Sequence, residues 1–150
     1  MRFLCFFKSL NTFIATAWCV SYVGAKPVFV DCDGGTWQID PKKIEKKITK
    51  KTKAIIGVYL YGQPFDIDGV NKIAKKNKLL IVEDAAQAHG AMYKGKKVGS
   101  FGQVGTFSFY PSKNLGAYGE GGALTTNNVS YAERLKALRN HGSPTKYKHE

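Results

Sequence analysis

The stretch that decides the fold is "KAIIGVYLYGQPFDIDGVNKIAKKNKLLIVEDA", residues 53–85. Two short apolar runs, residues 53–62 and 79–85, flank a stretch with helical periodicity at residues 66–78. The apolar face of this helix consists of Val70, Ile73 and Ala74. Continuous apolar runs are typical of strands that are buried on both sides. The stretch therefore predicts a strand, an amphipathic helix and a parallel strand, joined by a right-handed crossover.

The same alternation extends upstream. "PVFVD" at residues 27–31 predicts a strand, and "DPKKIEKKI" at residues 40–48 predicts a helix. Asp40 suits the helix cap and Pro41 the first helical position. Two successive strand–helix–strand units predict an α/β fold with a mostly parallel sheet flanked by helices.

Downstream, the pattern is less regular. We expect strands at residues 104–110 and 122–127, and a helix at residues 130–142 that is capped by Ser130 and ended by glycine. Because the chain has no internal repeat, low-complexity tract or linker, the sequence predicts one domain or a piece of one.

The composition narrows the classes of partner. The net charge of +12 permits attraction to nucleic acid, anionic lipid or a phosphorylated small molecule. Lysine far outnumbers arginine, which argues against a nucleic-acid reader, since such proteins rely on arginine for bidentate contacts. The three cysteines lack CxxC spacing and nearby histidines, so we expect neither a disulfide framework nor a metal site.

The N-terminal segment "MRFLCFFKSLNTFIATAW" resembles a secretion signal, with Ala15-Thr16-Ala17 as a possible cleavage site. Lys8, Ser9 and Asn11 interrupt its apolar core, however. No apolar run approaches the roughly 18 residues of a membrane span. We therefore expect a cytoplasmic protein with no membrane partner.

Two carboxylates, Glu83 and Asp84, end the strand at residues 79–85. Ligands of parallel α/β sheets bind beyond the carboxyl ends of the strands. A carboxylate at this position suits a magnesium ion, a ribose hydroxyl or a cationic ring nitrogen, and a helix-capping role is equally compatible with the pattern.

A single lysine stands out in "TFSFYPSKNLGAYGEGG", residues 106–122. If Phe109, Tyr110 and Tyr118 surround Lys113, partial desolvation favours the neutral amine, which is a nucleophile suited to a Schiff base. A surface lysine on a glycine-rich loop is the alternative. The glycines suit either a tight strand connection or a phosphate-cradling loop, but the dinucleotide and P-loop signatures are absent.

Taken together, these segments resemble one family. "NTFIATAWCVSYVGAKPVFVD", "KTKAIIGVYLYGQPFDID", "EDAAQAHGA", "FSFYPSKNLGAYGEGG" and "RLKALRNHG" follow the order and spacing of the DegT/DnrJ/EryC1/StrS aminotransferases. The resemblance extends from about Asn11 to Gly142. It implies the large domain of the aspartate-aminotransferase-like fold type I, with pyridoxal 5′-phosphate (PLP) as cofactor.

The resemblance also implies a role for five residues. Lys113 matches the catalytic lysine that forms the internal aldimine, and Asp84 matches the carboxylate that pairs with the pyridinium nitrogen. Gln87 matches a side chain near the phenolic oxygen, Ser108 a hydroxyl that binds the phosphate, and Phe13 the aromatic that stacks on the ring. Because a related branch with histidine at the lysine position performs dehydration, Lys113 favours transamination.

The implied reaction moves an amino group, with glutamate as the donor, to a keto group on a nucleotide-linked sugar, for polysaccharide or amino-sugar biosynthesis. The family further implies a homodimer. Residues 1–10 do not match the family, and residues 11–150 match only part of its large domain, with the small C-terminal domain absent. We therefore expect an interior fragment; the alternatives are a catalytically incomplete chain or a noncatalytic interaction subunit and, more remotely, a basic nucleic-acid-binding module.

Overall fold

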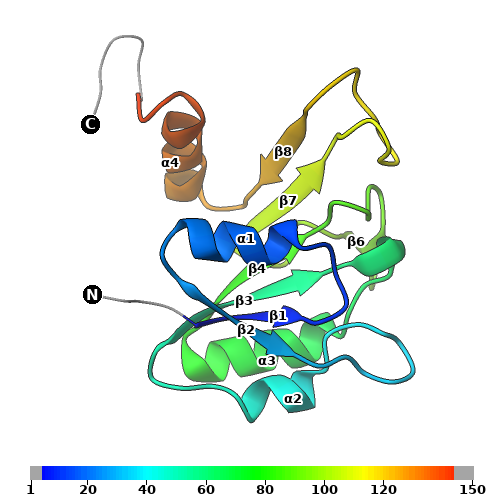
Figure 1. Cartoon of the computed structure of the whole chain (residues 1–150), viewed down its shortest axis with the longest axis vertical. Helices are drawn as coiled ribbons and strands as arrows, with labels where there is room; N and C mark the ends of the chain where they lie inside the picture. The colour runs from blue at the N-terminus through cyan, green and yellow to red at the C-terminus, as the bar shows by residue number, and fades with distance from the viewer. Residues whose placement is uncertain (1–4, 144–150) are drawn as a thin grey trace.

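The computed structural model describes the backbone of residues 5–143 and the side chains of residues 10–143. Its main feature is a six-stranded sheet with the strand order β2-β1-β3-β4-β7-β8 (Figure 1). All neighbouring strands are parallel except β7 and β8, which are antiparallel. The strands are β1 (Cys5–Ser9), β2 (Lys26–Val30), β3 (Thr52–Val58), β4 (Leu80–Asp84), β7 (Val104–Ser108) and β8 (Gly122–Thr125). The predicted mostly parallel α/β sheet is confirmed.

Strand β1 was not expected from the sequence. It lies between β2 and β3 and is parallel to both, so the segment set apart as residues 1–10 contributes a strand to the common sheet. β1 has only five residues, and the polar Lys8 and Ser9 interrupt the apolar pattern from which strands are predicted. As a result, β2 and β3 are not neighbours, and the connection between them passes over β1.

Helices cover both faces of the sheet, as predicted. Helix α1 (Ala15–Tyr22) lies on one face, whereas α2 (Pro41–Glu45) and α3 (Ile67–Asn77) lie on the other (Figure 1). Successive residues of β3 show why: Ile55 packs into the α3 side, and Ile56 packs with Val20 of α1. Burial on both faces accounts for the continuous apolar run, because successive side chains of a strand point to opposite faces.

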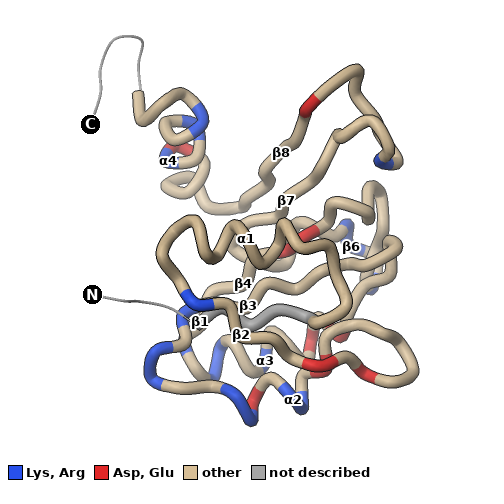
Figure 2. Tube along the Cα trace, viewed as in Figure 1, with Lys and Arg blue, Asp and Glu red and all other residues tan. Residues whose placement is uncertain are grey.

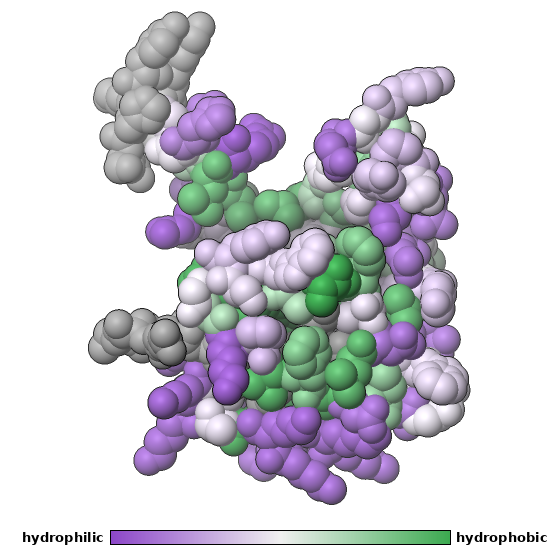
Figure 3. All heavy atoms as spheres, in the orientation of Figure 1, coloured by the Kyte–Doolittle hydropathy of each residue, from purple (hydrophilic) through white to green (hydrophobic). Residues whose placement is uncertain are grey.

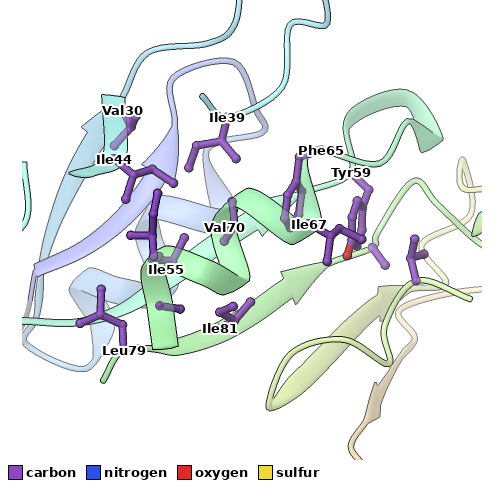
Figure 4. Close-up of a cluster of buried hydrophobic side chains, with 14 of the residues drawn as sticks. Val30, Ile39, Ile44, Ile55, Tyr59, Phe65, Ile67, Val70, Leu79 and Ile81 are labelled. Carbon is purple, nitrogen blue, oxygen red and sulfur yellow. The ribbon is translucent and has the colours of Figure 1, made fainter. Parts of the chain in front are cut away.

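The main core fills the space between α3 and the sheet (Figure 4). Val70, Ile73 and Ala74, the predicted apolar face of α3, are all buried there. Phe65 stacks on Tyr59 with ring centroids 4.7 Å apart. Removing a large apolar side chain of this kind from water stabilises the fold by about 1.5–3 kcal/mol.

Several strand and helix boundaries in the structure differ from those predicted from the sequence. The run 53–62 is a strand only to Val58, since a 3₁₀ turn (η1, Leu60–Gly62) takes its last residues out of the sheet. The helix expected at 40–48 ends at Glu45, although Asp40 caps it through the Lys42 N–H, as predicted.

Helix α4 (Val129–Arg139) begins earlier than expected, because Asn128 rather than Ser130 caps it. The Asn128 side-chain oxygen accepts from the Tyr131 N–H at 3.1 Å. The short hairpin β5 (Met92–Tyr93) and β6 (Lys96–Lys97) lies between β4 and β7 along the chain. Among the described residues, no helix is long and apolar enough to cross a membrane.

Candidate functional site

A cavity of about 760 Å³ opens at the carboxyl ends of β3, β4 and β7, on the face of the sheet that α1 covers. Its wall is formed by alternate strand residues, such as Val82 and Asp84 of β4, together with the start of α1 and the loop after β7. All five residues singled out from the sequence line it: Phe13, Asp84, Gln87, Ser108 and Lys113. Segments a hundred residues apart in the chain thus meet at one place, whereas the role of each residue stays a prediction.

Asp84 is held at the cavity wall by two donors. The Thr16 hydroxyl donates to Oδ2 at 2.6 Å, and the Ala86 N–H donates to Oδ1 at 3.1 Å. Both carboxylate oxygens are therefore oriented. The Ala86 contact closes a local turn and does not cap a helix, so the helix-capping interpretation of Asp84 is wrong.

Thr16 is a cavity residue that sequence reasoning missed. It belongs to the first turn of α1, is only 7% exposed and lies within 3.4 Å of the Thr12 hydroxyl. In the sequence, Ala15-Thr16-Ala17 resembled a signal-cleavage pattern. The contact with Asp84 spans 68 residues, so no local pattern could reveal it.

Glu83 points away from the cavity into the core and has no exposed surface. It accepts hydrogen bonds from the Tyr59 hydroxyl at 2.6 Å and from the N–H groups of Gly99, Phe101 and Gly102 at 2.6, 2.7 and 2.5 Å. Burial, together with the Glu83 carboxylate, raises the pKa of Tyr59 well above its ordinary value. Glu83 therefore ties the loop before β7 to the sheet, and of the two carboxylates only Asp84 stays a candidate for ligand binding.

Gln87 is oriented by the turn after β3. Its Oε1 accepts from the Tyr61 N–H at 2.9 Å, which identifies the oxygen end of the amide and leaves the NH₂ group as a donor. Tyr61 has a positive φ of 56°, an unusual conformation for a residue with a side chain. The turn therefore presents the N–H that holds Gln87 at the cavity wall.

Lys113 lies on the loop that joins β7 to β8. A tight turn forms here, in which the Lys113 N–H donates to the Tyr110 carbonyl and the Tyr110 N–H donates to the Ser108 hydroxyl. Gly116 is required at this turn, since a Cβ there would lie 2.3 Å from the Pro111 carbonyl oxygen. The glycines lie in the connection between β7 and β8, and their use as a phosphate-cradling loop stays a prediction.

The aromatic enclosure expected around Lys113 is wrong in part. Tyr110 lines the cavity with it, but Tyr118 is fully exposed and Phe109 packs against His89, with ring centroids 5.7 Å apart. Side chains two residues apart in an extended segment lie on the same face, which separates Phe109 from Ser108 and Tyr110. Phe13, 69% exposed, lies at the rim of the cavity.

The comparisons with known proteins agree with this geometry. The family model described as the DegT/DnrJ/EryC1/StrS aminotransferase family matches residues 8–150. A dTDP-3-amino-3,6-dideoxy-alpha-D-galactopyranose transaminase of Aneurinibacillus thermoaerophilus is 58% identical over 137 residues, which is 91% of this chain and 38% of that relative. The chain thus spans less than two fifths of the length of this relative.

Solved structures show the same fold. The S. venezuelae DesV, crystallised with a ketimine intermediate, has a TM-score of 0.95 and 47% identity, covering 98% of this chain and 40% of DesV. NtdA of Bacillus subtilis, solved with its cofactor PMP, has a TM-score of 0.91 and 36% identity, covering 98% of this chain and 33% of NtdA. The predicted PLP-dependent transferase fold is confirmed. The chain belongs to the DegT/DnrJ/EryC1/StrS aminotransferase family.

Proposed function

We propose that the cavity binds PLP and that the chain is part of an aminotransferase acting on a keto group of a nucleotide-linked sugar, with glutamate as the amino donor. The observation that carries this proposal is the meeting of Asp84 and Lys113 in one cavity at the carboxyl ends of parallel strands. The substrate class rests on relatives that are named as transaminases of dTDP-linked sugars.

The residues present fit the cofactor. A cavity of about 760 Å³ is within the usual range for small-molecule sites, which is roughly 300–1,000 Å³. Asp84 offers an anionic partner for a protonated ring nitrogen, held in place by Thr16 and Ala86. The Gln87 NH₂ group suits the phenolic oxygen, and Ser108 retains a hydroxyl proton for the phosphate.

Each residue has a distinct task in this proposal. PLP, when bound, supplies an electron sink for the substrate's reacting carbon. Asp84 holds the ring-nitrogen proton that makes this possible, and Phe13 covers one face of the flat ring. The Lys113 Nζ would hold the cofactor and would move a proton at the substrate's reacting carbon.

Borohydride reduction tests the proposal directly. The purified chain is incubated with PLP, reduced with borohydride and digested, and mass spectrometry locates the phosphopyridoxyl group. We expect one group per chain, on Lys113. Lys113→Ala should abolish the modification, whereas Lys136→Ala, which changes an exposed lysine on α4, should leave it unchanged.

Two results would contradict the proposal. One is labelling scattered over the exposed lysines, and the other is labelling of Lys113 that persists in Asp84→Asn with unchanged PLP affinity. The first would mean that the described cavity does not bind PLP in this chain. The second would remove Asp84 from the site.

A further inference from the structure

The charge of the chain gathers at the end of the sheet opposite the cavity. Residues 42–53 contain seven lysines and one glutamate, and residues 72–78 contain four lysines and no acidic residue. Together they account for ten of the twelve net positive charges. Because both segments lie outside the cavity wall, this charge does not serve a ligand held in the cavity.

The two segments are neighbours in the fold. They include the carboxyl ends of α2 and α3, and the chain between Glu45 and Thr52 leads into the amino end of β3. Blue segments gather at this end in Figure 2, and hydrophilic side chains cover α2 in the same orientation in Figure 3. We call this surface the amino-end lysine patch; it comprises Lys46, Lys47, Lys50, Lys51, Lys53, Lys75 and Lys78, all of them exposed.

The patch is hollowed at its centre. A depression of about 550 Å³ is lined by Lys50, Lys53 and Lys78, together with Ile48, Thr49, Thr52 and Asn77. Among the side chains of residues 10–143, none of the acidic ones lines it. Three lysines thus line one concave surface.

Little of this charge is neutralised within the fold. Among the described residues, the ion pairs are Lys43 with Asp31, Lys76 with Glu45 and Lys94 with Asp68, so none of them involves the patch. Lys47 donates to the Phe29 carbonyl, which is uncharged. The patch therefore holds seven positive charges close together, and their mutual repulsion falls when an external anionic surface approaches.

The residue types in the patch distinguish the partner. The patch contains lysine without arginine, and none of the described aromatic residues lines the depression. Arginine forks and aromatic stacking platforms are the usual means of holding nucleic acid. Clustered lysines instead suit the diffuse negative charge of a phospholipid surface, to which each lysine adds attraction without requiring a fixed geometry.

We propose that the amino-end lysine patch binds the chain to membrane surfaces that contain anionic phospholipid. The strand β3 runs from Thr52, beside the patch, to Val58, at the cavity. This is about 20 Å at about 3.3 Å per residue, more than twice the screening length of roughly 8 Å at physiological salt. In this orientation, the cavity opens away from the membrane and stays accessible to a dissolved substrate.

Vesicle co-sedimentation of the full chain tests the proposal. The probes are vesicles of phosphatidylcholine alone and vesicles that also contain phosphatidylglycerol, at low and at raised salt. We expect binding only to the anionic vesicles, and weaker binding as the salt concentration rises. The patch variant Lys50→Gln, Lys51→Gln, Lys53→Gln, Lys78→Gln should bind roughly 600-fold more weakly, since each of the four lysines near an anionic surface contributes about fivefold in affinity.

The control removes the same number of charges elsewhere. The variant Lys96→Gln, Lys97→Gln, Lys136→Gln, Arg139→Gln has the same net charge as the patch variant and changes only exposed residues. It should bind within about threefold of the unmodified chain. Circular dichroism checks that both variants keep their secondary structure.

Three results would overturn the proposal. The first is an absence of binding to anionic vesicles at low salt, and the second is an equal loss of binding in the control variant. The third is displacement from the vesicles by single-stranded RNA whose phosphate concentration is lower than that of the anionic lipid. The last would identify nucleic acid as the partner. None of these results depends on PLP, so the test stands apart from that of the proposed function.

Discussion

The two faces of the sheet at the end of β4 differ in how they bury and hydrogen-bond a carboxylate. Glu83 points to one face, where it is fully buried and accepts four hydrogen bonds within the protein. Asp84, the next residue, points to the other face, lines the cavity and has two donors. Both side chains are acidic and adjacent in sequence, but the first one stabilises the fold and the second one is available to a ligand.

This difference follows from what covers each face. On the Glu83 face, the loop before β7 closes over the strand and directs three backbone N–H groups at the carboxylate. On the Asp84 face, α1 contributes a hydroxyl but leaves the cavity open. A carboxylate whose acceptor sites are all used within the protein has none left for a ligand, so only Asp84 has acceptor capacity left for one.

The largest effect on stability is expected from Glu83→Ala. The substitution leaves three backbone N–H groups and the Tyr59 hydroxyl without their acceptor in the core. At about 1–3 kcal/mol for each unsatisfied buried donor, the loss approaches the whole stability of a typical domain, which is about 5–15 kcal/mol. Urea denaturation followed by circular dichroism measures it.

Glu83→Gln is the matched control, because the amide keeps the size of the side chain and one acceptor oxygen. We expect a loss between that of Glu83→Ala and zero. An unfolding free energy of Glu83→Ala within about 1 kcal/mol of the unmodified chain would show that the four hydrogen bonds do not stabilise the fold.

The next largest effect is expected from Tyr59→Phe. The ring can keep its stacking on Phe65, but Glu83 loses its hydroxyl donor, at about 1.5–3 kcal/mol for a hydrogen bond to a charged group. The folded-state pKa of Tyr59 is raised, so its contribution to stability is complete below the unfolded value of about 10 and is lost as the pH rises above it. Tyr59→Phe should not show this loss of stability at alkaline pH.

Urea denaturation at a series of pH values checks the sign. The unfolding free energy of the unmodified chain should fall more steeply above about pH 10 than that of Tyr59→Phe. Equal slopes would mean that the folded protein does not hold the Tyr59 proton more tightly than the unfolded chain does.

Thr16→Val should have a smaller effect on stability, about 1–2 kcal/mol, because water in the open cavity can replace the lost donor to Asp84. If Asp84 binds the cofactor as proposed, the loss of the hydrogen bond that orients its carboxylate should weaken PLP binding about tenfold, which is 1.4 kcal/mol. A fluorescence titration with PLP measures the affinity. Thr16→Ser keeps the hydroxyl and should restore it, whereas a failure of Thr16→Ser to do so would assign the loss to packing.

Asp84→Asn should have the smallest effect on stability, within about 1 kcal/mol, because the amide oxygen can still accept from Thr16 or Ala86. Its effect on PLP affinity should be the largest of the four, since it removes the charge that would pair with the ring nitrogen. Urea denaturation and PLP titration on the same sample compare the two. A large loss of stability with unchanged PLP affinity would reverse the contrast between Asp84 and Glu83.

The fold was largely predictable, because its signals are local. The run at residues 53–85 carries its own strand, helix and strand pattern, and the structure reproduces it with Ile55 and Ile56 on opposite faces. β1 and α1 were not assigned, since β1 is short and polar at one end and the exposed side of α1 carries Trp18 and Tyr22. An apolar exposed side hides the periodicity that identifies a helix.

The sequence was enough to name residues of the candidate site, but not the contacts that hold them in place. Lys113, Asp84, Gln87, Ser108 and Phe13 were named from motifs, and all five line one cavity. Thr16 and Tyr59, which also line it, were not named, since each acts through a partner at least 24 residues away. The prediction that aromatic side chains surround Lys113 was wrong in part for a similar reason. Tyr118 is close to Lys113 in sequence, but its side chain is fully exposed.

The sequence by itself determined the strands and helices with strong periodicity, the family, and the fact that Glu83 and Asp84 point to opposite faces, because a strand alternates its side chains with a period of two. Only the tertiary structure decided which of the two carboxylates meets the cavity. That choice depends on what packs over each face, the loop at residues 99–102 on one side and Thr16 of α1 on the other. Both come from segments distant from β4 in the chain, so long-range packing, which local patterns do not encode, separates the structural carboxylate from the one available for chemistry.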